Sequence, residues 1–161
     1  MEPRADRANV AFSPMVDLTE QDLLTGLLHS SAFARRIDAQ LRRAQGTDES
    51  LAVIVVELPP PSDDGVLIDA ARRVRDVTRS CDHVARNGAG ELAVCCPGAT
   101  EAEGRAVARR IAEVLAQPFE IDGAYLVVRV GVGLFFRDRV SAEDSSAFVL
   151  LAARASIDYW L

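Results

Sequence analysis

The sequence predicts an α+β domain in which helices cover a central antiparallel sheet. Short apolar runs and amphipathic stretches follow one another in the order β-α-β-β-α-β, with a further helix at each end. This order is typical of a ferredoxin-like layout. A length of 161 residues, with 49% hydrophobic and 26% charged residues, suits one folded domain with a full core.

The first half of the chain supplies two helices and the central strand. A helix is expected after Ser30 or Ser31, because apolar residues recur there at every fourth position. The run 51–58 is almost continuously apolar and rich in β-branched residues, which indicates a strand buried on both faces. A second amphipathic helix is expected over about 64–79.

A hairpin and three further elements complete the predicted fold. Strands at 83–86 and 91–96 flank a turn whose glycines, Gly88 and Gly90, suit positive φ angles. A third helix is expected over 100–117. The remaining expected elements are a hairpin of 119–121 with 124–135 around an Asp-Gly turn, and a closing helix over 142–160. In the strand 91–96, Cys95 and Cys96 are expected to face opposite sides as buried small hydrophobes.

The amino-acid composition indicates which kinds of binding partner to expect. The net charge is −6, from 24 acidic and 18 basic residues, so a broad electrostatic contact with nucleic acid is not expected. All of the basic residues are arginines, so any phosphate contact must come from Arg. No apolar run approaches the roughly 20 residues that span a bilayer, and the start of the chain does not read as a signal peptide. The expectation is a cytoplasmic protein with a flexible arm over 1–17 and one domain over 18–161.

One spacing of residues carries most of the functional information. Arg79-Ser80-Cys81-Asp82 is followed, after five residues, by Gly88-Ala89-Gly90-Glu91-Leu92. This pattern resembles the signature hairpin of the GGDEF family, the bacterial enzymes that make cyclic di-GMP. Asp22-Leu23-Leu24-Thr25-Gly26-Leu27 is similar to the motif that opens these domains, and the resemblance covers roughly 18–160. It implies the nucleotidyl-cyclase-like form of the predicted fold.

The departures from the family pattern gather in its active site. Gly90 stands where the family has a metal-binding Asp or Glu, and Glu57 stands where it has its first metal-binding Asp. The segment after Glu57 is shorter than in active members by roughly ten residues, nearly three helical turns. Pro59-Pro60-Pro61 stands in its place. The phosphate-binding Lys is missing, and so, by this comparison, is the last strand. The resemblance therefore implies a domain that is not an enzyme and that holds no metal or cofactor.

The Arg-x-x-Asp pair, by contrast, is intact at the spacing of the family's inhibitory site. A guanidinium at Arg79 can bind phosphate or the O6/N7 edge of guanine, and a carboxylate at Asp82 can accept from guanine N–H groups. The resemblance places a second ligand-binding Arg at Arg110, or at Arg109 if the register is shifted by one. The alternative is structural: Arg79 would stabilise a helix end and Asp82 would form a turn.

Three functions follow from these observations. The first is a cyclic di-GMP receptor that relays the bound state to an unidentified protein partner or to a homodimer. The second is a nucleotide-independent scaffold that docks proteins through its N-terminal arm or its Tyr159-Trp160 end. The third is residual cyclase or GTP-binding activity, in which Glu57 and Glu91 would hold the metal.

Overall fold

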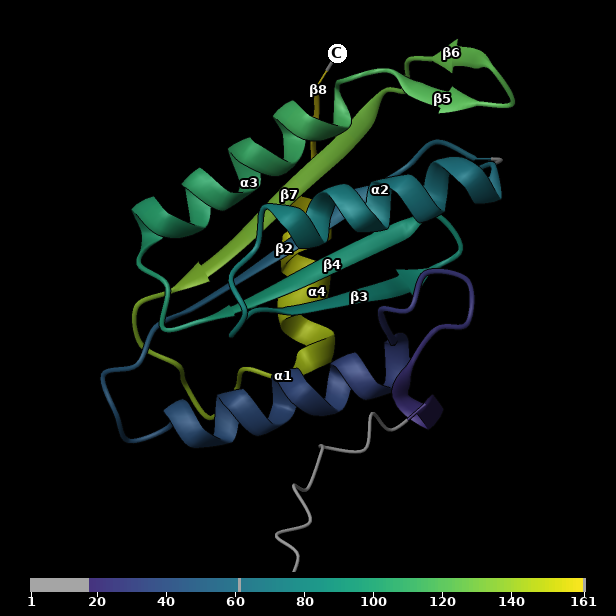
Figure 1. The fold of residues 1–161 in the computed structure, drawn as a ribbon. Coiled ribbons are helices and arrows are strands. Elements are labelled where there is room, and N and C mark those ends of the chain that lie inside the picture. Colours follow the sequence, from purple (N-terminus) through teal and green to yellow (C-terminus); the bar gives the residue numbers. More distant parts are fainter. Residues whose placement is uncertain (1–17, 61, 161) are drawn as a thin grey trace, which may run out of the picture.

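The computed structural model describes residues 18–60 and 62–160, and it has the predicted α+β architecture (Figure 1). The predicted arm over 1–17 lies outside the described residues. Six strands form one sheet in the order β1-β3-β4-β2-β7-β8. Its strands are β1 (Leu28–His29), β2 (Leu51–Glu57), β3 (His83–Gly88), β4 (Glu91–Pro97), β7 (Val130–Arg137) and β8 (Asp158–Trp160). All neighbours in this sheet are antiparallel except β1 and β3.

Two pairs of helices cover the two faces of this sheet (Figure 1). The first pair is α2 (Asp64–Asp76) and α3 (Glu101–Leu115), and the second is α1 (Ser30–Ala44) and α4 (Ser146–Ala155). A short 3-10 helix, η1 (Leu18–Glu20), precedes them. Helices α2 and α3 begin within one residue of the predicted starts, at Asp64 and Glu101, whereas α4 begins at Ser146 rather than 142. Thr100 and Glu103 form a reciprocal capping box at the start of α3.

The central strand β2 separates two hydrophobic cores. Its first six residues are all buried, as expected for a strand covered on both faces. Phe33 and Ile37 of α1 belong to one core and Leu67 of α2 to the other. Cys95 and Cys96 are both fully buried, one in each core, which confirms that they face opposite sides of the sheet.

The end of the chain differs from the prediction of one helix over 142–160. Helix α4 stops at Ala155, and the chain then forms β8, which pairs with β7, so the expected absence of a last strand is wrong. Ser156 stands at the end of the helix, where its hydroxyl lies within hydrogen-bond distance of the Ala153 carbonyl. The same hydroxyl donates to the carbonyl of Leu134 on β7 and accepts from the Leu134 N–H. A Cβ at Gly133 would lie 2.0 Å from the Ala153 carbonyl oxygen, so only glycine lets α4 cross β7 this closely.

The predicted strand over 124–135 is also two separate strands. β5 (Phe119–Ile121) and β6 (Ala124–Leu126) form their own two-stranded sheet, and β7 starts at Val130 in the main sheet. The turn between β5 and β6 is confirmed, with positive φ at Asp122 (51°) and Gly123 (79°). The pairing of β5 with β6 ends at Leu126, which lies opposite Phe119, the first residue of β5. The chain then crosses to the main sheet, where Val130 is buried.

No helix among the described residues has the length and apolar character needed to cross a membrane.

Candidate functional site

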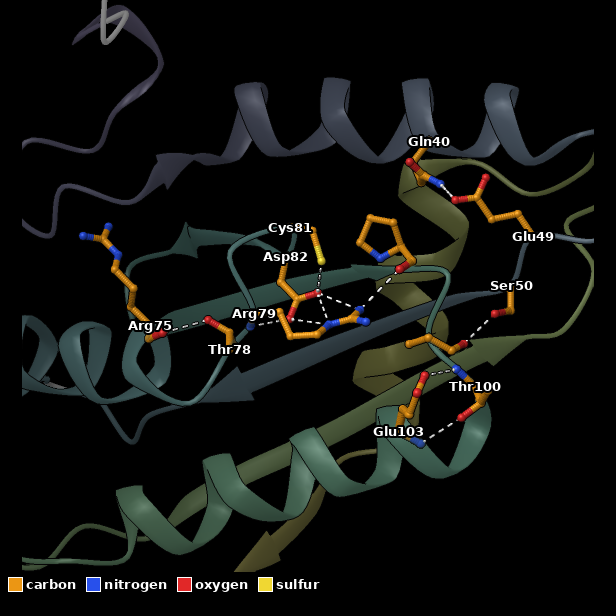
Figure 2. A network of polar contacts seen from close by, with 12 residues as sticks. Gln40, Glu49, Ser50, Arg75, Thr78, Arg79, Cys81, Asp82, Thr100 and Glu103 are labelled. Atoms are coloured by element: carbon orange, nitrogen blue, oxygen red, sulfur yellow. Dashed lines mark hydrogen bonds and ion pairs between the residues drawn. The ribbon is translucent and has the colours of Figure 1, made fainter. Parts of the chain in front are cut away.

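Arg79 and Asp82 form a closed pair on the turn between α2 and β3 (Figure 2). The expected helix over 64–79 ends early, at Asp76, so Arg79 lies in the turn. Asp82 Oδ2 accepts from the Arg79 backbone N–H at 2.8 Å, and Oδ1 accepts from Arg79 Nη2 at 2.9 Å and Nε at 3.1 Å. These bonds raise the pKa of Arg79 above its usual value.

The two partners are exposed to very different degrees. The Asp82 side chain is 0% exposed, whereas the Arg79 side chain is 42% exposed. Arg79 Nη2 also donates to the Pro97 carbonyl at 3.2 Å, which fixes the guanidinium on a second strand end. Asp82 therefore orients Arg79, and the guanidinium is the member of the pair that faces solvent.

A cavity of about 540 Å³ adjoins this pair. Three arginines are among its lining residues, Arg36 on α1, Arg75 on α2 and Arg79, together with residues of the 26–28 segment. One lining residue is a carboxylate, the buried Asp82 that pairs with Arg79, and Glu20 pairs with Arg36 at 2.7 Å from beside the cavity. Burial and the nearby Arg36 both lower the pKa of His83, another lining residue. The cavity thus has an excess of positive charge, although the chain as a whole carries −6.

The third predicted binding residue lies elsewhere. Arg110 is exposed on α3 and does not line the cavity around Arg79. Its neighbour Arg109 lines a different cavity, between α3 and β7. The structure instead brings Arg36 and Arg75 to Arg79, and neither was predicted. Arg75 lies one helical turn before Arg79 in the sequence, a spacing that could have revealed it.

The signature hairpin, Gly88 to Leu92, joins β3 to β4 with a register shift between Arg86 and Gly88. Neither Gly88 nor Gly90 has positive φ, so the prediction of a left-handed turn there is wrong. The need for glycine at Gly90 is one of space. A Cβ at this position would lie 3.0 Å from the Leu58 carbonyl oxygen and 3.1 Å from Ser62 Oγ. The Gly90 carbonyl also accepts from Leu58 N–H at 2.8 Å, so the backbone after β2 closes directly over the signature.

Glu91 is held by two neighbours. Arg154 on α4 donates to both of its oxygens, Nε to Oε2 at 2.8 Å and Nη2 to Oε1 at 2.7 Å. The amide of Asn87 also donates to Oε1. Burial acts to raise the pKa of Glu91, but the bonds from Arg154 and Asn87 outweigh it and hold the pKa below its usual value. Both carboxylate oxygens are therefore already used within the protein.

Glu57 lies opposite Glu91 at the end of the central strands, as their paired Cα positions show. It lines a cavity of about 570 Å³ with Gly90 and Pro60, and it has an interaction partner within the protein. Across residues 18–60 and 62–160, no group of three or more His, Cys, Asp or Glu side chains is placed to hold a metal ion.

The opening motif is tied to this hairpin. Asp22 accepts from Thr25 N–H at 2.9 Å and from Thr25 Oγ1 at 2.7 Å, and Gly26 closes the turn at φ +71°. Arg86 then bridges the Asp22 carboxylate, at 3.2 Å, to the Ala89 carbonyl, at 3.1 Å. Arg75 Nη2 donates to the Gly26 carbonyl at 3.2 Å. One loop thus contacts both the signature hairpin and the cavity around Arg79.

Solved structures share this fold. The GGDEF domain of FimX from Pseudomonas aeruginosa superposes with a TM-score of 0.77 at 21% identity, covering 85% of this chain and 90% of that one. A sensory box/GGDEF family protein from Caulobacter crescentus gives a TM-score of 0.74 at 26% identity, covering 85% of this chain and 94% of that one. The fold therefore defines a GGDEF-type domain.

Sequence comparison gives the same family. The family described as "Diguanylate cyclase, GGDEF domain" matches residues 61–155. An uncharacterized signaling protein of Caulobacter vibrioides is 32% identical over 140 residues, 78% of this chain and 17% of its own length. The diguanylate cyclase TpbB of Pseudomonas aeruginosa is 30% identical over 125 residues, 70% of this chain and 29% of its own length. The chain belongs to the GGDEF family of cyclic di-GMP signalling, and it spans less than a third of these curated relatives.

Proposed function

We propose that this chain is a catalytically inactive GGDEF domain that binds cyclic di-GMP at Arg79 and relays the bound state to a protein partner. The observation that carries the proposal is the pair of Arg79 and Asp82. A fully buried carboxylate fixes a half-exposed guanidinium in a residue that lines a cavity, and the lining residues include three arginines and one carboxylate. This geometry suits an anionic ligand, since a guanidinium that is already oriented loses little entropy on binding.

The chemistry of the ligand fits the charge of the cavity. Cyclic di-GMP has two anionic phosphodiesters and two guanines whose O6 and N7 atoms accept hydrogen bonds. A guanidinium can donate hydrogen bonds to either group. In Arg79, Nε and Nη2 already donate to Asp82 and to the Pro97 carbonyl, so in this proposal Nη1 donates to the ligand. Asp82 acts in this proposal through Arg79 rather than on the ligand, because its oxygens are already bonded to Arg79 and its side chain is buried. The solved GGDEF domain of DgcB from Caulobacter crescentus is a complex with c-di-GMP, on the same fold at 19% identity and a TM-score of 0.71.

Loss of catalysis is the second half of the proposal. Two features at the signature argue for it. Gly90 offers no side-chain ligand atom, and a Cβ there would lie 3.0 Å from the Leu58 carbonyl oxygen. Glu91 is bonded through both oxygens to Arg154. A Mg²⁺ that also binds a triphosphate needs several oxygens at about 2.1 Å. Among these residues only Glu57 remains, and it too has a partner within the protein.

Calorimetric titration with cyclic di-GMP tests the binding half. We expect micromolar binding by the wild-type chain and a loss of about 10- to 100-fold in Arg79→Ala, because a charge-assisted hydrogen bond contributes about 1.5–3 kcal/mol. Arg105→Ala is the matched control, since Arg105 is an exposed arginine that pairs with Glu101 outside this cavity. A folded wild-type protein that releases no heat would refute the proposal and favour the scaffold function.

A double-mutant cycle separates the roles of the pair. If Asp82 acts through Arg79, the double variant Arg79→Ala/Asp82→Ala should bind no more weakly than Arg79→Ala alone. Additive losses would mean that Asp82 contacts the ligand itself. Thermal unfolding of each variant checks that the turn still folds, because Asp82 is buried.

A further inference from the structure

The β5–β6 hairpin presents an uncovered apolar edge. Tyr125, Leu126 and Val127 are consecutive, and their side chains are 76%, 46% and 65% exposed. Seven large hydrophobic residues are exposed in the described part of the chain, and three of them lie in this one run. Such a concentration at one place is typical of an interaction surface, whereas single exposed apolar residues are ordinary.

The hairpin is firmly held on the domain, so its exposure does not come from loose packing. Phe119 of β5 is fully buried, and the Arg73 guanidinium lies 4.0 Å over its ring. Arg73 also donates to the carbonyls of Val114, Gln117 and Pro118. Ile121 packs so closely on the start of α2 that a Cβ at Gly65 would lie 2.9 Å from its Cδ1. The apolar run therefore has a rigid support.

The backbone of β6 also has an open edge. In the register of this hairpin Ile121 lies opposite Ala124, and Phe119 lies opposite Leu126. These pairs flank a two-residue turn, so their hydrogen bonds point into the hairpin, and those of Tyr125 point outward. Proteins usually protect such an edge with a charge, a proline or a bulge. The run 124–128, Ala-Tyr-Leu-Val-Val, contains neither a charged residue nor a proline.

We propose that this edge pairs, in antiparallel orientation, with the same edge of a second copy of the chain. The sequence of the edge is self-complementary. Asp122 precedes the apolar run and Arg129 follows it, so antiparallel pairing brings opposite charges together at both ends. Parallel pairing would instead bring like charges together.

The pairing has a definite register. When Leu126 lies opposite Leu126 of the second copy, the outward backbone groups of Tyr125 meet those of Val127 on the other chain. Each Tyr125 side chain then faces a Val127, an aromatic and β-branched pair that is favourable across antiparallel strands. A cavity of about 300 Å³ beside the edge is lined by apolar residues that include Leu126, Val127 and Val66, and also by Asp63 and Arg129. This pairing does not depend on the proposed nucleotide binding.

Sedimentation of the full chain without nucleotide, from low micromolar to near-millimolar concentration, tests the proposal. We expect a reversible dimer that becomes a monomer in the double variant Tyr125→Lys/Val127→Lys. Leu151→Lys, at a residue 64% exposed on α4, is the control that should remain dimeric. Circular dichroism and thermal unfolding confirm that each variant is folded, and the substituted side chains are exposed enough to leave the core unchanged.

A cross-link tests the register. In a Cys81→Ser background, which removes the one exposed cysteine of the described chain, Leu126→Cys should form a dimer disulfide on mild oxidation, and Leu151→Cys should not. A wild-type monomer at every concentration would overturn the proposal. A dimer that survives the lysine substitutions, or one that cross-links equally through residue 151, would overturn it as well. Dimerisation that appears only after deletion of 1–17 would identify that segment as the occupant instead.

Discussion

Gly90 lies at the closest approach between the signature hairpin and the segment that follows β2. The nearest atom to its missing side chain is the Leu58 carbonyl oxygen, which is itself backbone and cannot move like the end of a flexible side chain. A larger residue therefore requires the Leu58 carbonyl to shift by a few tenths of an ångström. In the proposed inactive domain, the missing acidic side chain and the close Leu58 carbonyl would act as two separate obstacles to catalysis.

We expect that Gly90→Asp, which restores the type of side chain that the family has there, does not restore synthesis of cyclic di-GMP from GTP and Mg²⁺. Overpacking against Leu58 should lower the free energy of unfolding by about 1–3 kcal/mol. Chromatographic product analysis and denaturant unfolding measure the two effects. Gly88→Ala is the control, since its Cβ would only reach ordinary contact, 3.4 Å from the Glu91 Cβ. Product formation by Gly90→Asp would show that the remaining groups are sufficient for catalysis.

The Glu91–Arg154 pair makes stability depend on pH. The bonds from Arg154 and Asn87 overcome the effect of burial and lower the pKa of Glu91 on folding. The pair therefore stabilises the fold at pH values above the unfolded-state pKa of about 4.3, and this contribution is lost as the pH falls through the folded value. Arg154→Ala should lower the free energy of unfolding by about 1–2 kcal/mol at pH 7.

Urea unfolding at a series of pH values measures this contribution. The curves for wild type and Arg154→Ala should converge as the pH falls below the lowered pKa of Glu91 in the folded wild type, where Glu91 is protonated in both proteins. Arg105→Ala, which breaks an exposed pair one helical turn apart, should cost about 0.3–0.5 kcal/mol. A difference for Arg154→Ala that stays constant with pH would mean that packing, rather than charge, carries its effect.

At the scale of the elements, Arg73 is the main connection between α2 and the start of the β5–β6 hairpin. Its side chain is only 14% exposed, and its three bonds reach carbonyls at the end of α3 and just beyond it. The last carbonyls of a helix have no partner within the helix. Arg73 supplies those partners from a different element, so it fixes the position of the hairpin as well as the end of α3.

Arg73→Ala should lower the free energy of unfolding by about 2–3 kcal/mol, because three carbonyls lose a charged donor and Phe119 loses the guanidinium over its ring. Hydrogen exchange should increase first in β5, β6 and the end of α3. The neighbouring Arg72→Ala is the control, since Arg72 is 63% exposed and pairs only with Asp69 and Asp76 on its own helix. Equal effects of the two substitutions would contradict the role given to Arg73.

The elements that the sequence predicts well are those that a local pattern defines. The run 51–57 and helix α3 follow from apolar periodicity and caps, and both are present. The break between β6 and β7 escaped prediction because apolar residues continue across it with only Arg129 between them, although the strands belong to different sheets. The end of α4 depends on contacts of Ser156 and Gly133 with elements far along the chain, which no local pattern contains.

In the candidate site, too, local sequence patterns predict some features, whereas others depend on contacts between segments far apart in the chain. The spacing of Arg79 and Asp82 predicts that they form a pair, but the burial of Asp82 depends on how β3 and β4 pack. Arg36 reaches the cavity only because α1 lies over β3 in the folded sheet. The position of Gly90 in the motif predicts a lost ligand, whereas the nearby carbonyl of Leu58 comes from the segment just after β2, far along the chain.

For the whole molecule, electrostatics sets how an anionic ligand approaches. The chain is acidic, at −6, and the cavity around Arg79 is a local region of the opposite sign. The net negative charge of the chain repels a dianionic ligand at long range, whereas the arginines of the cavity attract it at short range. Added salt weakens both the repulsion and the attraction. The attraction operates at short distance in a partly enclosed cavity, where screening is weaker than between exposed charges.

We expect the affinity for cyclic di-GMP to change by less than about tenfold between low salt and physiological ionic strength, because the two effects oppose each other. Arg36→Ala and Arg75→Ala should each weaken binding, by less than Arg79→Ala does, since Arg36 also pairs with Glu20 and Arg75 with the Gly26 carbonyl. Calorimetry at several salt concentrations measures both. Binding unchanged in Arg36→Ala and Arg75→Ala would place the ligand on another face of Arg79.

The reactivity of the two adjacent cysteines can be used to measure how often each helix layer separates from the sheet. Burial raises the pKa of Cys96 to about 12 and that of Cys95 as well, so neither thiol reacts while its layer is closed. Cys95 becomes reactive when the layer of α1 and α4 separates from the sheet, and Cys96 when the layer of α2 and α3 does. Cys81, which is exposed, gives the reaction rate of an open thiol in the same molecule. Labelling under native conditions therefore times the opening of each layer separately, without any change to the sequence.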